Sequence, residues 1–591
     1  MADNVIFGIN GPVVTVKNTS AFAMQEMVYV GEQRLVGEVI GINRDRTIIQ
    51  VYEVTTGLKP GEPVYPTGTP LSVTLGPGIM RGIFDGIERP LLRIQEQSGS
   101  PFINRGSMID SLDTEAVWDC RMKAKVGDTL AGGAVYAECD ETPTVVHRMM
   151  VPPDLSGTVT FSAADGSYKV NDKILTLKDE NGVEHDLTLC QRWPIRTPRP
   201  VSNRLECNIP LITGQRVIDT LFPIAKGGTA AIPGGFGTGK TMTQHQLAKW
   251  CDADIIVYVG CGERGNEMTQ VLEEFGELID PRTSKKLTDR TVLIANTSNM
   301  PVAAREASIY TGITLAEYYR DMGYDVALMA DSTSRWAEAL REISGRLEEM
   351  PAEEGFPAYL PSRLSEFYER AGLAQTLSGS RGSVSVIGAV SPQGSDFSEP
   401  VTQNTKRFTR VFWALDKALA YQRHYPAINW NTSYSEYDLD LANWYETNVK
   451  PDFMEQRAEL MGLLREESAL MEIVKLIGSD VLPDDQKLVI EISRVIRVGF
   501  LQQNAYHEDD TYVPLEKQYL MMDIILYLYH RAKQLLTANV PIARLIEAGL
   551  FDKLVKMKYD IPNNKPEMFD AYKKDIDTAI EGLLANATAQ K

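Results

Sequence analysis

The spacing of apolar and polar residues predicts mainly β-strands in the N-terminal third of the chain. Up to about residue 70, short runs rich in β-branched residues, such as 36–40 and 47–52, alternate with turn residues, and this predicts a small β-barrel or sandwich. The same β-strand pattern recurs from about 110 to 190, where Gly132-Gly133, Asp165-Gly166 and Asn181-Gly182 are candidate hairpin turns between strands of alternating apolar and polar residues. That stretch predicts a second β-rich module.

From about residue 205 to 435 the pattern changes to repeated units of strand, turn and helix, as expected of a parallel sheet flanked by helices. The predicted strands are 229–232, 255–260, 292–295, 326–330 and 384–389. Pro301 favours the first turn of a helix that runs to about residue 321 and stops near Gly323. Ser334 is a candidate N-cap for a helix over 336–347.

After about residue 436 the apolar positions recur at helical spacing over long stretches. The predicted helices are 453–476, 486–503, 516–536 and 569–584. The predicted fold class is multidomain α/β. Its parts are an N-terminal β-barrel (1–72), an inserted β-rich domain (110–190), a parallel-sheet domain (73–109 and 191–435) and a C-terminal helical bundle (436–591).

Composition limits the classes of function. The 591 residues exceed what one core supports, and the formal net charge of −19 argues against a non-specific nucleic-acid clamp, which needs a basic surface. Six cysteines show no C-x-x-C pair, so neither a zinc site nor a disulfide framework is indicated. The most apolar late stretch, 518–530, is too short to span a bilayer and contains Asp523. Any link to a membrane would come through partners.

The strongest chemical signal is a loop that fits G-x-x-x-x-G-K-[ST], the pattern that wraps the phosphates of ATP or GTP. Its residues are Gly234, Gly235, Phe236, Gly237, Thr238, Gly239, Lys240 and Thr241. The glycines let backbone N–H groups approach phosphate oxygens, Lys240 can reach the β- and γ-phosphates, and the Thr241 hydroxyl can ligate Mg²⁺. An apolar strand precedes the loop and a predicted helix over 240–250 follows it, which favours a phosphate site over a glycine-rich turn with an incidental lysine.

Charged residues follow two of the predicted strands at the edge where open α/β sheets bind ligands. Glu263 and Arg264 come just after one strand; they could polarise the attacking water and contact the γ-phosphate, or form a surface ion pair. Asp331 ends another strand, as an aspartate that holds Mg²⁺ through water does, although a helix-capping role has the same sequence pattern. Arg335 could face the phosphates, or it could be a surface residue at the start of a helix with no role in the site.

Aromatic residues often stack on the adenine of bound nucleotides. Tyr425 and Tyr506 are the candidates here, with packing in the core as the alternative for each. The six histidines are scattered, so the sequence indicates no metal cluster.

With these residues assembled, the chain resembles the catalytic A subunits of the rotary V-type and A-type ATPases over essentially its full length. The motifs that carry the resemblance are residues 76–79 (GPGI), 84–87 (FDGI), 214–219 (GQRVID), the phosphate loop, 259–267 (VGCGERGNE), 296–301 (NTSNMP), 329–336 (MADSTSRW) and 398–402 (SEPVT). The stretch from about 110 to 190 matches the inserted "bulge" domain that separates A subunits from the β subunits of F-type synthases.

The resemblance implies a RecA-like P-loop domain and a catalytic function, the hydrolysis or synthesis of ATP coupled to rotation of a central stalk and to H⁺ or Na⁺ translocation. It implies an alternating A3B3 hexamer with a B-type subunit that supplies an arginine finger, together with central and peripheral stalk subunits and, indirectly, a membrane ion-translocating sector. It also implies a place on the cytoplasmic side of the membrane, peripheral through partners, and no nucleic-acid partner.

For the site, the resemblance implies three catalytic residues, Glu263, Lys240 and Arg264, with Mg²⁺ as the cofactor held by Thr241 and by Asp331 through water. Beyond the phosphate loop, the residues expected at the nucleotide are Met242, Arg335, Tyr425, Gln503 and Tyr506. Thr238 stands where eukaryotic members carry a cysteine, so their disulfide inhibition is not expected here.

A non-catalytic ring subunit that binds nucleotide without turning it over is the alternative function. Such a subunit would typically have lost the carboxylate or the phosphate-loop lysine, and this chain has both Glu263 and Lys240. A nucleic-acid translocase built on the same ATPase core would need basic, aromatic-bearing loops and is disfavoured by the net charge.

Overall fold

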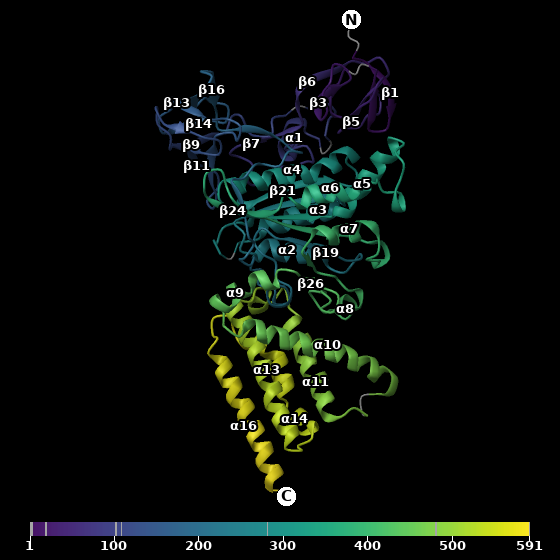
Figure 1. Cartoon of the computed structure of the whole chain (residues 1–591), viewed down its shortest axis with the longest axis vertical. Coiled ribbons are helices and arrows are strands. Elements are labelled where there is room, and N and C mark those ends of the chain that lie inside the picture. The colour runs from purple at the N-terminus through teal and green to yellow at the C-terminus, as the bar shows by residue number, and fades with distance from the viewer. Residues whose placement is uncertain are drawn as a thin grey trace. The chain divides into compact units, whose positions relative to one another are not determined.

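The computed structural model describes residues 4–17, 20–100, 103–107, 109–280, 282–478 and 481–589 (Figure 1). The chain forms two compact units. The first comprises Met1–Glu206, Lys226–Ala231 and Ala253–Thr409, and the second comprises Cys207–Ala225, Ile232–Asp252 and Arg410–Lys591. In the described part of the chain, no helix is long and apolar enough to cross a membrane.

The first unit begins with the expected N-terminal β-barrel, a sheet of order β1-β2-β5-β4-β3-β6. Its strands are β1 (Ile6–Asn10), β2 (Val13–Val16), β3 (Glu26–Val30), β4 (Leu35–Ile42), β5 (Thr47–Val51) and β6 (Val64–Pro70). Alternate residues such as Val28, Val30 and Ile49 are fully buried in a separate core, which explains the β-branched runs of the sequence.

The inserted domain consists of two four-stranded sheets around its own apolar core, in the orders β10-β13-β15-β16 and β12-β11-β9-β14. Its strands are β9 (Val117–Met122), β10 (Thr129–Leu130), β11 (Val135–Asp140), β12 (Val146–Met150), β13 (Gly157–Ser162), β14 (Gly166–Lys169), β15 (Leu175–Lys178) and β16 (Glu184–Leu187). Asn181-Gly182 joins the antiparallel pair β15 and β16, so that hairpin prediction is confirmed. The hairpins predicted at Gly132-Gly133 and Asp165-Gly166 are not found, because each of those turns carries the chain from one sheet to the other.

A mostly parallel sheet forms the centre of the first unit, in the order β19-β24-β22-β20-β21-β8. Its strands are β8 (Ile83–Phe84), β19 (Thr229–Pro233), β20 (Ile255–Glu263), β21 (Thr291–Thr297), β22 (Asp325–Asp331) and β24 (Arg381–Val390), and all five predicted strands are confirmed within a few residues. The short strands β7 (Ser72–Leu75) and β17 (Gln191–Pro194) pair with each other, and β18 (Asn203–Leu205) pairs with β23 (Gly372–Gln375).

Most helices of the first unit pack on this sheet, and the last two pack on neighbouring helices. They are α1 (Leu91–Ser98), α3 (Gly265–Glu277), α4 (Val302–Asp321), α5 (Thr333–Arg346), α6 (Leu360–Tyr368) and α7 (Pro400–Phe408). The α4 helix contacts β20, β21, β22 and β24, and eighteen of its residues are buried, which is why it lacks a polar face. Its extent and its end before Gly323 are confirmed, but Pro301 lies at the N-cap and not in the first turn, where it was predicted. Ser334, by contrast, lies inside α5 and its hydroxyl accepts the backbone N–H of Ser391, so its predicted capping role was wrong.

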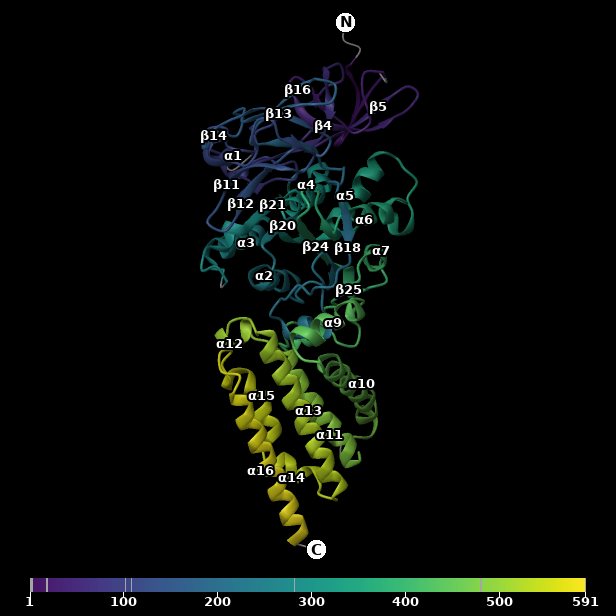
Figure 2. The same cartoon turned by 60° about the vertical axis from the view of Figure 1, so that its left-hand side comes forward.

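The second unit contains α2 (Lys240–Trp250) and the C-terminal helices, among which α13 packs against α10, α11 and α16 (Figures 1 and 2). The helices of this unit after residue 410 are α8 (Lys417–Tyr421), α9 (Asp438–Asn448), α10 (Phe453–Ile477), α11 (Asp484–Arg494), α12 (Glu508–Thr511), α13 (Leu515–Thr537), α14 (Ile542–Glu547), α15 (Leu550–Asp560) and α16 (Met568–Ala589). The short strands β25 (Val411–Phe412) and β26 (Tyr434–Ser435) pair with each other. The helix predicted over 486–503 continues from α11 into a π-helix, Val495–Leu501, and then stops.

Candidate functional site

The phosphate loop connects β19 to α2, which begins at Lys240 as the sequence predicted. Gly237 and Gly239 have φ angles of 78° and 90°, in the left-handed region that only glycine adopts readily. A Cβ on Gly234 would lie 2.6 Å from the Thr238 hydroxyl oxygen and 2.8 Å from Leu415 Cβ. The loop conformation therefore requires glycine at three of its positions.

Polar groups inside the loop hold it together. The Thr238 hydroxyl donates to the carbonyl oxygen of Gly235 at 2.8 Å. Lys240 Nζ donates to the carbonyl oxygens of Gly234 at 2.7 Å and Gly235 at 3.1 Å. The ammonium group thus lies over the concave side of its own loop, where a phosphate bound by a loop of this type would meet it.

Beside the loop, entirely within the second unit, lies a cavity of about 740 Å³. Its lining comes from five stretches of sequence: Gln215; Gly237, Gly239, Met242, Thr243 and Gln246; Arg423, Tyr425 and Pro426; Gln502, Gln503, Asn504, Ala505 and Tyr506; and Tyr559. This volume suits a nucleoside-sized ligand. The predicted residues Met242, Tyr425, Gln503 and Tyr506 thus lie together around one cavity that begins at the phosphate loop.

The two predicted aromatic residues are exposed to this cavity and do not pack in a core. Tyr425 is 43% exposed and its ring carbon Cε1 lies 3.6 Å from the position of a Cβ on Gly239, while Tyr506 is 88% exposed. Gln503 has a different role, since its side chain is 5% exposed and binds backbone groups. Its Oε1 accepts the N–H of Arg216 at 2.9 Å and its Nε2 donates to the carbonyl of Gly214 at 2.8 Å, so both ends of the side-chain amide hold the backbone of 214–216.

In the first unit, Glu263 and Asp331 end the adjacent parallel strands β20 and β22. Asp331, which is 2% exposed, pairs in register with Gly260, and the Tyr258 hydroxyl donates to Asp331 Oδ2 at 3.2 Å. Burial, followed by the negative charges of Asp331 and Glu267, raises the pKa of Glu263 to about 8. The two strand-end carboxylates therefore form one electrostatically coupled acidic group.

The two predicted arginines lie near these carboxylates on helix starts. Arg264 immediately precedes α3 and is exposed. Arg335 is in the first turn of α5 and its Nη1 pairs with Glu338 Oε2 at 2.9 Å, but its positive charge also acts on Glu263, where it lowers the pKa against the larger effects of burial and Asp331. The capping alternative for Asp331 does not hold, because Ser332 occupies the N-cap position of α5.

Several residues of the cavity were missed at the sequence level, among them Gln215, Gln246, Arg423 and Tyr559. Gln215 lies in the motif 214–219, to which no nucleotide contact was assigned, and the other three belong to none of the quoted motifs. Gln246 could have been anticipated from its position on α2, in the second turn after the loop. Tyr559 lies on α15, more than fifty residues beyond the rest of the lining, and no local signal identifies it.

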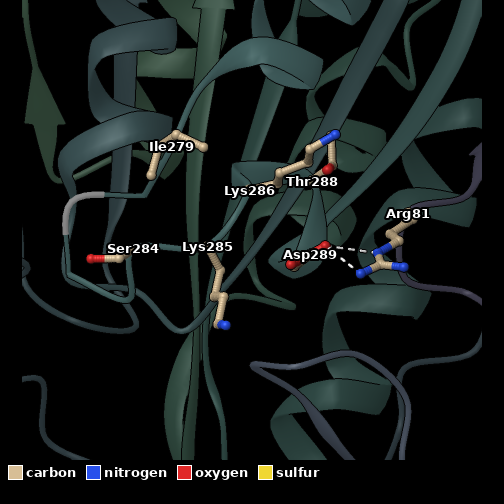
Figure 3. Close-up of a pocket in the computed structure, with 7 residues that line it drawn as sticks. All are labelled: Arg81, Ile279, Ser284, Lys285, Lys286, Thr288 and Asp289. Carbon is tan, nitrogen blue, oxygen red and sulfur yellow. Dashed lines mark hydrogen bonds and ion pairs between the residues drawn. The ribbon is translucent and has the colours of Figure 1, made fainter.

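A second hollow, of about 510 Å³, lies in the first unit and contains none of the predicted site residues. It is lined by Arg81, Ile279, Ser284, Lys285, Lys286, Thr288 and Asp289 (Figure 3). Arg81 is occupied by an ion pair with Asp289 at 2.6 Å, and the side chains of Lys285 and Lys286 extend in opposite directions. The cations do not converge on one point, so this hollow is a weak candidate for an anion site.

Comparison with known families agrees with this geometry. Residues 214–435 match the ATP synthase alpha/beta family, nucleotide-binding domain, and residues 6–68 match the beta-barrel domain of the same family. Residues 109–196 match the ATP synthase alpha/beta subunit barrel-sandwich domain, and residues 442–545 match the C-terminal domain of V and A type ATP synthase. A structure of the ATPase EscN from the type III secretion system of enteropathogenic E. coli shares the fold, with a TM-score of 0.63 over 88% of this chain and 99% of EscN at 20% identity.

Full-length relatives are much closer in sequence. The chain is 60% identical over 579 residues to the V-type ATP synthase alpha chain 2 of Clostridium tetani, with 98% of each protein covered. It is 61% identical to the V-type ATP synthase alpha chain of Halothermothrix orenii, covering 97% of this chain and 96% of the relative. It is 56% identical to the corresponding chain of the A-type ATP synthase of Methanopyrus kandleri, with 99% of each covered. The chain therefore belongs to the family of A (alpha) subunits of V-type and A-type ATP synthases, the ion-translocating enzymes that make or hydrolyse ATP.

Proposed function

We propose that this chain is the subunit that binds ATP and carries out its hydrolysis or synthesis within a rotary ATP synthase. The observation that carries the proposal is the cavity of about 740 Å³ that begins at the phosphate loop and is walled by exposed tyrosines. The coupled carboxylates Glu263 and Asp331 favour a catalytic subunit over a ring subunit that only binds nucleotide.

In this proposal the phosphate loop, from Gly234 to Thr241, binds the phosphates with its backbone N–H groups and the Lys240 ammonium. Lys240 would leave the carbonyls of Gly234 and Gly235 to do so, which exchanges two neutral acceptors for a charged one. Tyr425 and Tyr506 would stack against the base, with Met242 as an apolar contact. Arg264 and Arg335 would bind phosphate oxygens.

The chemistry of the donors fits Mg²⁺ that arrives with the nucleotide. Among the described residues there is no cluster of three or more His, Cys, Asp or Glu that could hold a metal ion by itself. Mg²⁺ is typically held by one or two protein oxygens together with water and substrate phosphates, and we assign Thr241 and, through water, Asp331 to that role. When bound, the ion neutralises charge on the phosphates. Burial is the main cause of the raised pKa of Glu263, and a cation would offset the negative charge of Asp331 and Glu267 that adds to it.

Glu263 is the proposed general base. As a carboxylate it would accept a hydrogen bond from the attacking water and orient it, which requires the ionised form. Because burial and the charge of Asp331 hold its pKa near 8 in the chain alone, the group is mostly protonated at pH 7. We infer that positive charge from the Mg²⁺ ion and from a cationic side chain of a partner completes the site.

We further propose that this completion comes from a B-type subunit, which donates an arginine finger in an alternating A3B3 ring. Such fingers typically contribute about a thousandfold or more in rate. Central and peripheral stalk subunits and a membrane ion-translocating sector would complete the assembly, with this chain on the cytoplasmic side of the membrane. The domain division at 1–72, 110–190, 73–109 with 191–435, and 436–591 stands as part of the same proposal.

The experiment is to measure ATP turnover by the chain alone and after assembly with a B-type partner, for the parent and for Lys240→Ala. We expect low turnover for the isolated chain, a large increase on assembly, and loss of nucleotide binding in the variant. Lys249→Ala, at the other end of α2, is the matched control and should bind nucleotide as the parent does. Unchanged ATP affinity of Lys240→Ala would refute the phosphate site, and full turnover by the isolated chain would refute the need for a partner.

A further inference from the structure

Three cations are buried behind the wall of the nucleotide cavity. Arg216, Lys517 and Lys558 are 0%, 2% and 3% exposed, and they come from the segment before the first π-helix (Val217–Leu221), from α13 and from α15. Lysines are rarely buried this deeply. The fully buried Asp510 pairs with Arg216, so the three cations share few carboxylates and rely on other acceptors.

Lys558 uses its ammonium group to bind the end of a helix. Its Nζ donates to the carbonyl oxygens of Val498 at 2.7 Å and Gln502 at 3.0 Å. These carbonyls close the helical stretch formed by α11 and the π-helix Val495–Leu501, where the last carbonyls have no partner within the helix. A cation at this position satisfies them and also interacts favourably with the negative end of the helix dipole.

Arg216 completes the same cap from the other side. Its Nη2 donates to the carbonyl of Gln502 at 2.8 Å and its Nε donates to the carbonyl of Phe500. Gln502 therefore receives a charge-assisted hydrogen bond from each of two cations on different segments. Hydrogen bonds of this kind are stronger and geometrically more demanding than neutral ones.

The capped segment is the wall of the cavity. Residues 502–506 follow directly after the π-helix, and all five line the cavity. The residue after Lys558, Tyr559, lines the same cavity, and its ring packs against His507 with a centroid distance of 4.7 Å. Lys558 thus binds the outer side of a wall whose inner side faces the ligand.

We propose that Lys558 is a positioning residue that sets the affinity and base selectivity of the nucleotide cavity, by fixing the wall segment 502–506 from α15. This inference rests on the proposed function, since it concerns the same cavity. Lys558 does not contact the ligand itself. It determines where Tyr506 and the backbone of the wall lie relative to the phosphate loop, which is in the same unit.

Lys517 supplies a matched control. It is as deeply buried as Lys558, but its Nζ donates to the carbonyls of Ile561 at 2.7 Å, Lys558 at 3.3 Å and Asp509 at 3.4 Å and to Asn563 Oδ1 at 3.0 Å, and to none of the wall residues 502–506. For both lysines, burial followed by the charge of Arg216 lowers the pKa to about 8. The two residues therefore share burial and electrostatics and differ in which backbone they hold.

The experiment measures binding of MgATP, MgGTP and inorganic tripolyphosphate to the full chain carrying Lys558→Met, Lys558→Arg or Lys517→Met. For Lys558→Met we expect ATP affinity to fall about tenfold and the preference between ATP and GTP to shrink. Tripolyphosphate, which has no base and makes no use of the wall segment 502–506, should bind as it does to the parent, and this also shows that the variant is folded. Lys558→Arg should recover most of the ATP affinity, and Lys517→Met should leave base selectivity unchanged.

Three results would overturn the inference while leaving the proposed function intact: parent-like ATP binding by Lys558→Met, an equal loss of ATP and tripolyphosphate affinity, or the same loss of selectivity in Lys517→Met. A parent chain that binds neither ATP nor tripolyphosphate would instead overturn the proposed function and this inference together.

Discussion

Replacing Glu263 with glutamine should lower activity and raise stability at the same time. The side chain ends β20 in a partly buried position, where Asp331 and Glu267 add negative charge. Glutamine keeps the shape and the hydrogen-bonding capacity of a protonated glutamate but cannot ionise. The substitution therefore removes a proposed base and a source of electrostatic strain together.

The size of the stability effect follows from the pKa. Since the folded pKa of Glu263 is about 8 and its ordinary value is 4.5, the folded chain holds the proton more tightly than the unfolded chain does. The associated stability is present in full below pH 4.5 and is lost as the pH rises to about 8, at up to about 1.4 kcal/mol for each pH unit. The upper limit above pH 8 is about 5 kcal/mol, and solvent around this partly exposed side chain reduces the expected value to about 1–2 kcal/mol.

Glu263→Gln escapes this loss. Its melting temperature should match that of the parent near pH 4.5 and exceed it increasingly up to pH 8, when both are measured without nucleotide or Mg²⁺. Turnover in the assembled enzyme should fall about a hundredfold to ten-thousandfold, because a positioned general base is lost, while ATP still binds. Such a gain in stability with a loss of activity is typical of strained functional sites.

Glu342→Gln, at an exposed position on α5, is the control and should alter neither property. A stability difference for Glu263→Gln that does not change between pH 4.5 and 8 would show that the carboxylate is not strained. Near-normal turnover would show that it is not the base.

Two further predictions concern the packing of the first unit. Gly86→Ala should destabilise the fold by about 1–3 kcal/mol, because the new Cβ would lie 2.0 Å from the carbonyl oxygen of Ala304. The control Gly276→Ala, whose Cβ would have nothing within 4 Å, should be neutral or slightly stabilising. Equal melting temperatures for the two variants would contradict the packing around Gly86. Glu141→Gln should cost about 3–5 kcal/mol, because Glu141 and His147 form a pair with side chains 1% and 0% exposed at 2.8 Å. Burial alone would raise the pKa of Glu141, but the charge and hydrogen bond of His147 keep it below 4.5. The loss of stability in Glu141→Gln should therefore shrink as the pH is lowered below 4.5, which denaturant titrations at a series of pH values would measure.

The parallel sheet was predictable because each of its central strands is buried on both faces. Continuous apolar runs such as 255–260 and 326–330 are then best interpreted as buried parallel strands. The glycine-rich motif between β19 and α2 locates the phosphate loop. The errors came where local residues permit several structures. Asp165-Gly166 is as good a hairpin turn as Asn181-Gly182, and only the packing of two sheets around one core decides which strands pair.

The two halves of a nucleotide differ in how far sequence can locate their binding site. A phosphate is bound by consecutive backbone N–H groups, so its site lies within one loop and leaves a pattern of glycines. A base is bound by the shape of a cavity, so its wall can come from any segments that meet in space. Here those segments include α15, on which Tyr559 lines the cavity and Lys558 binds the wall from behind. Because neither residue belongs to a motif, the sequence alone could not have located this part of the proposed base site.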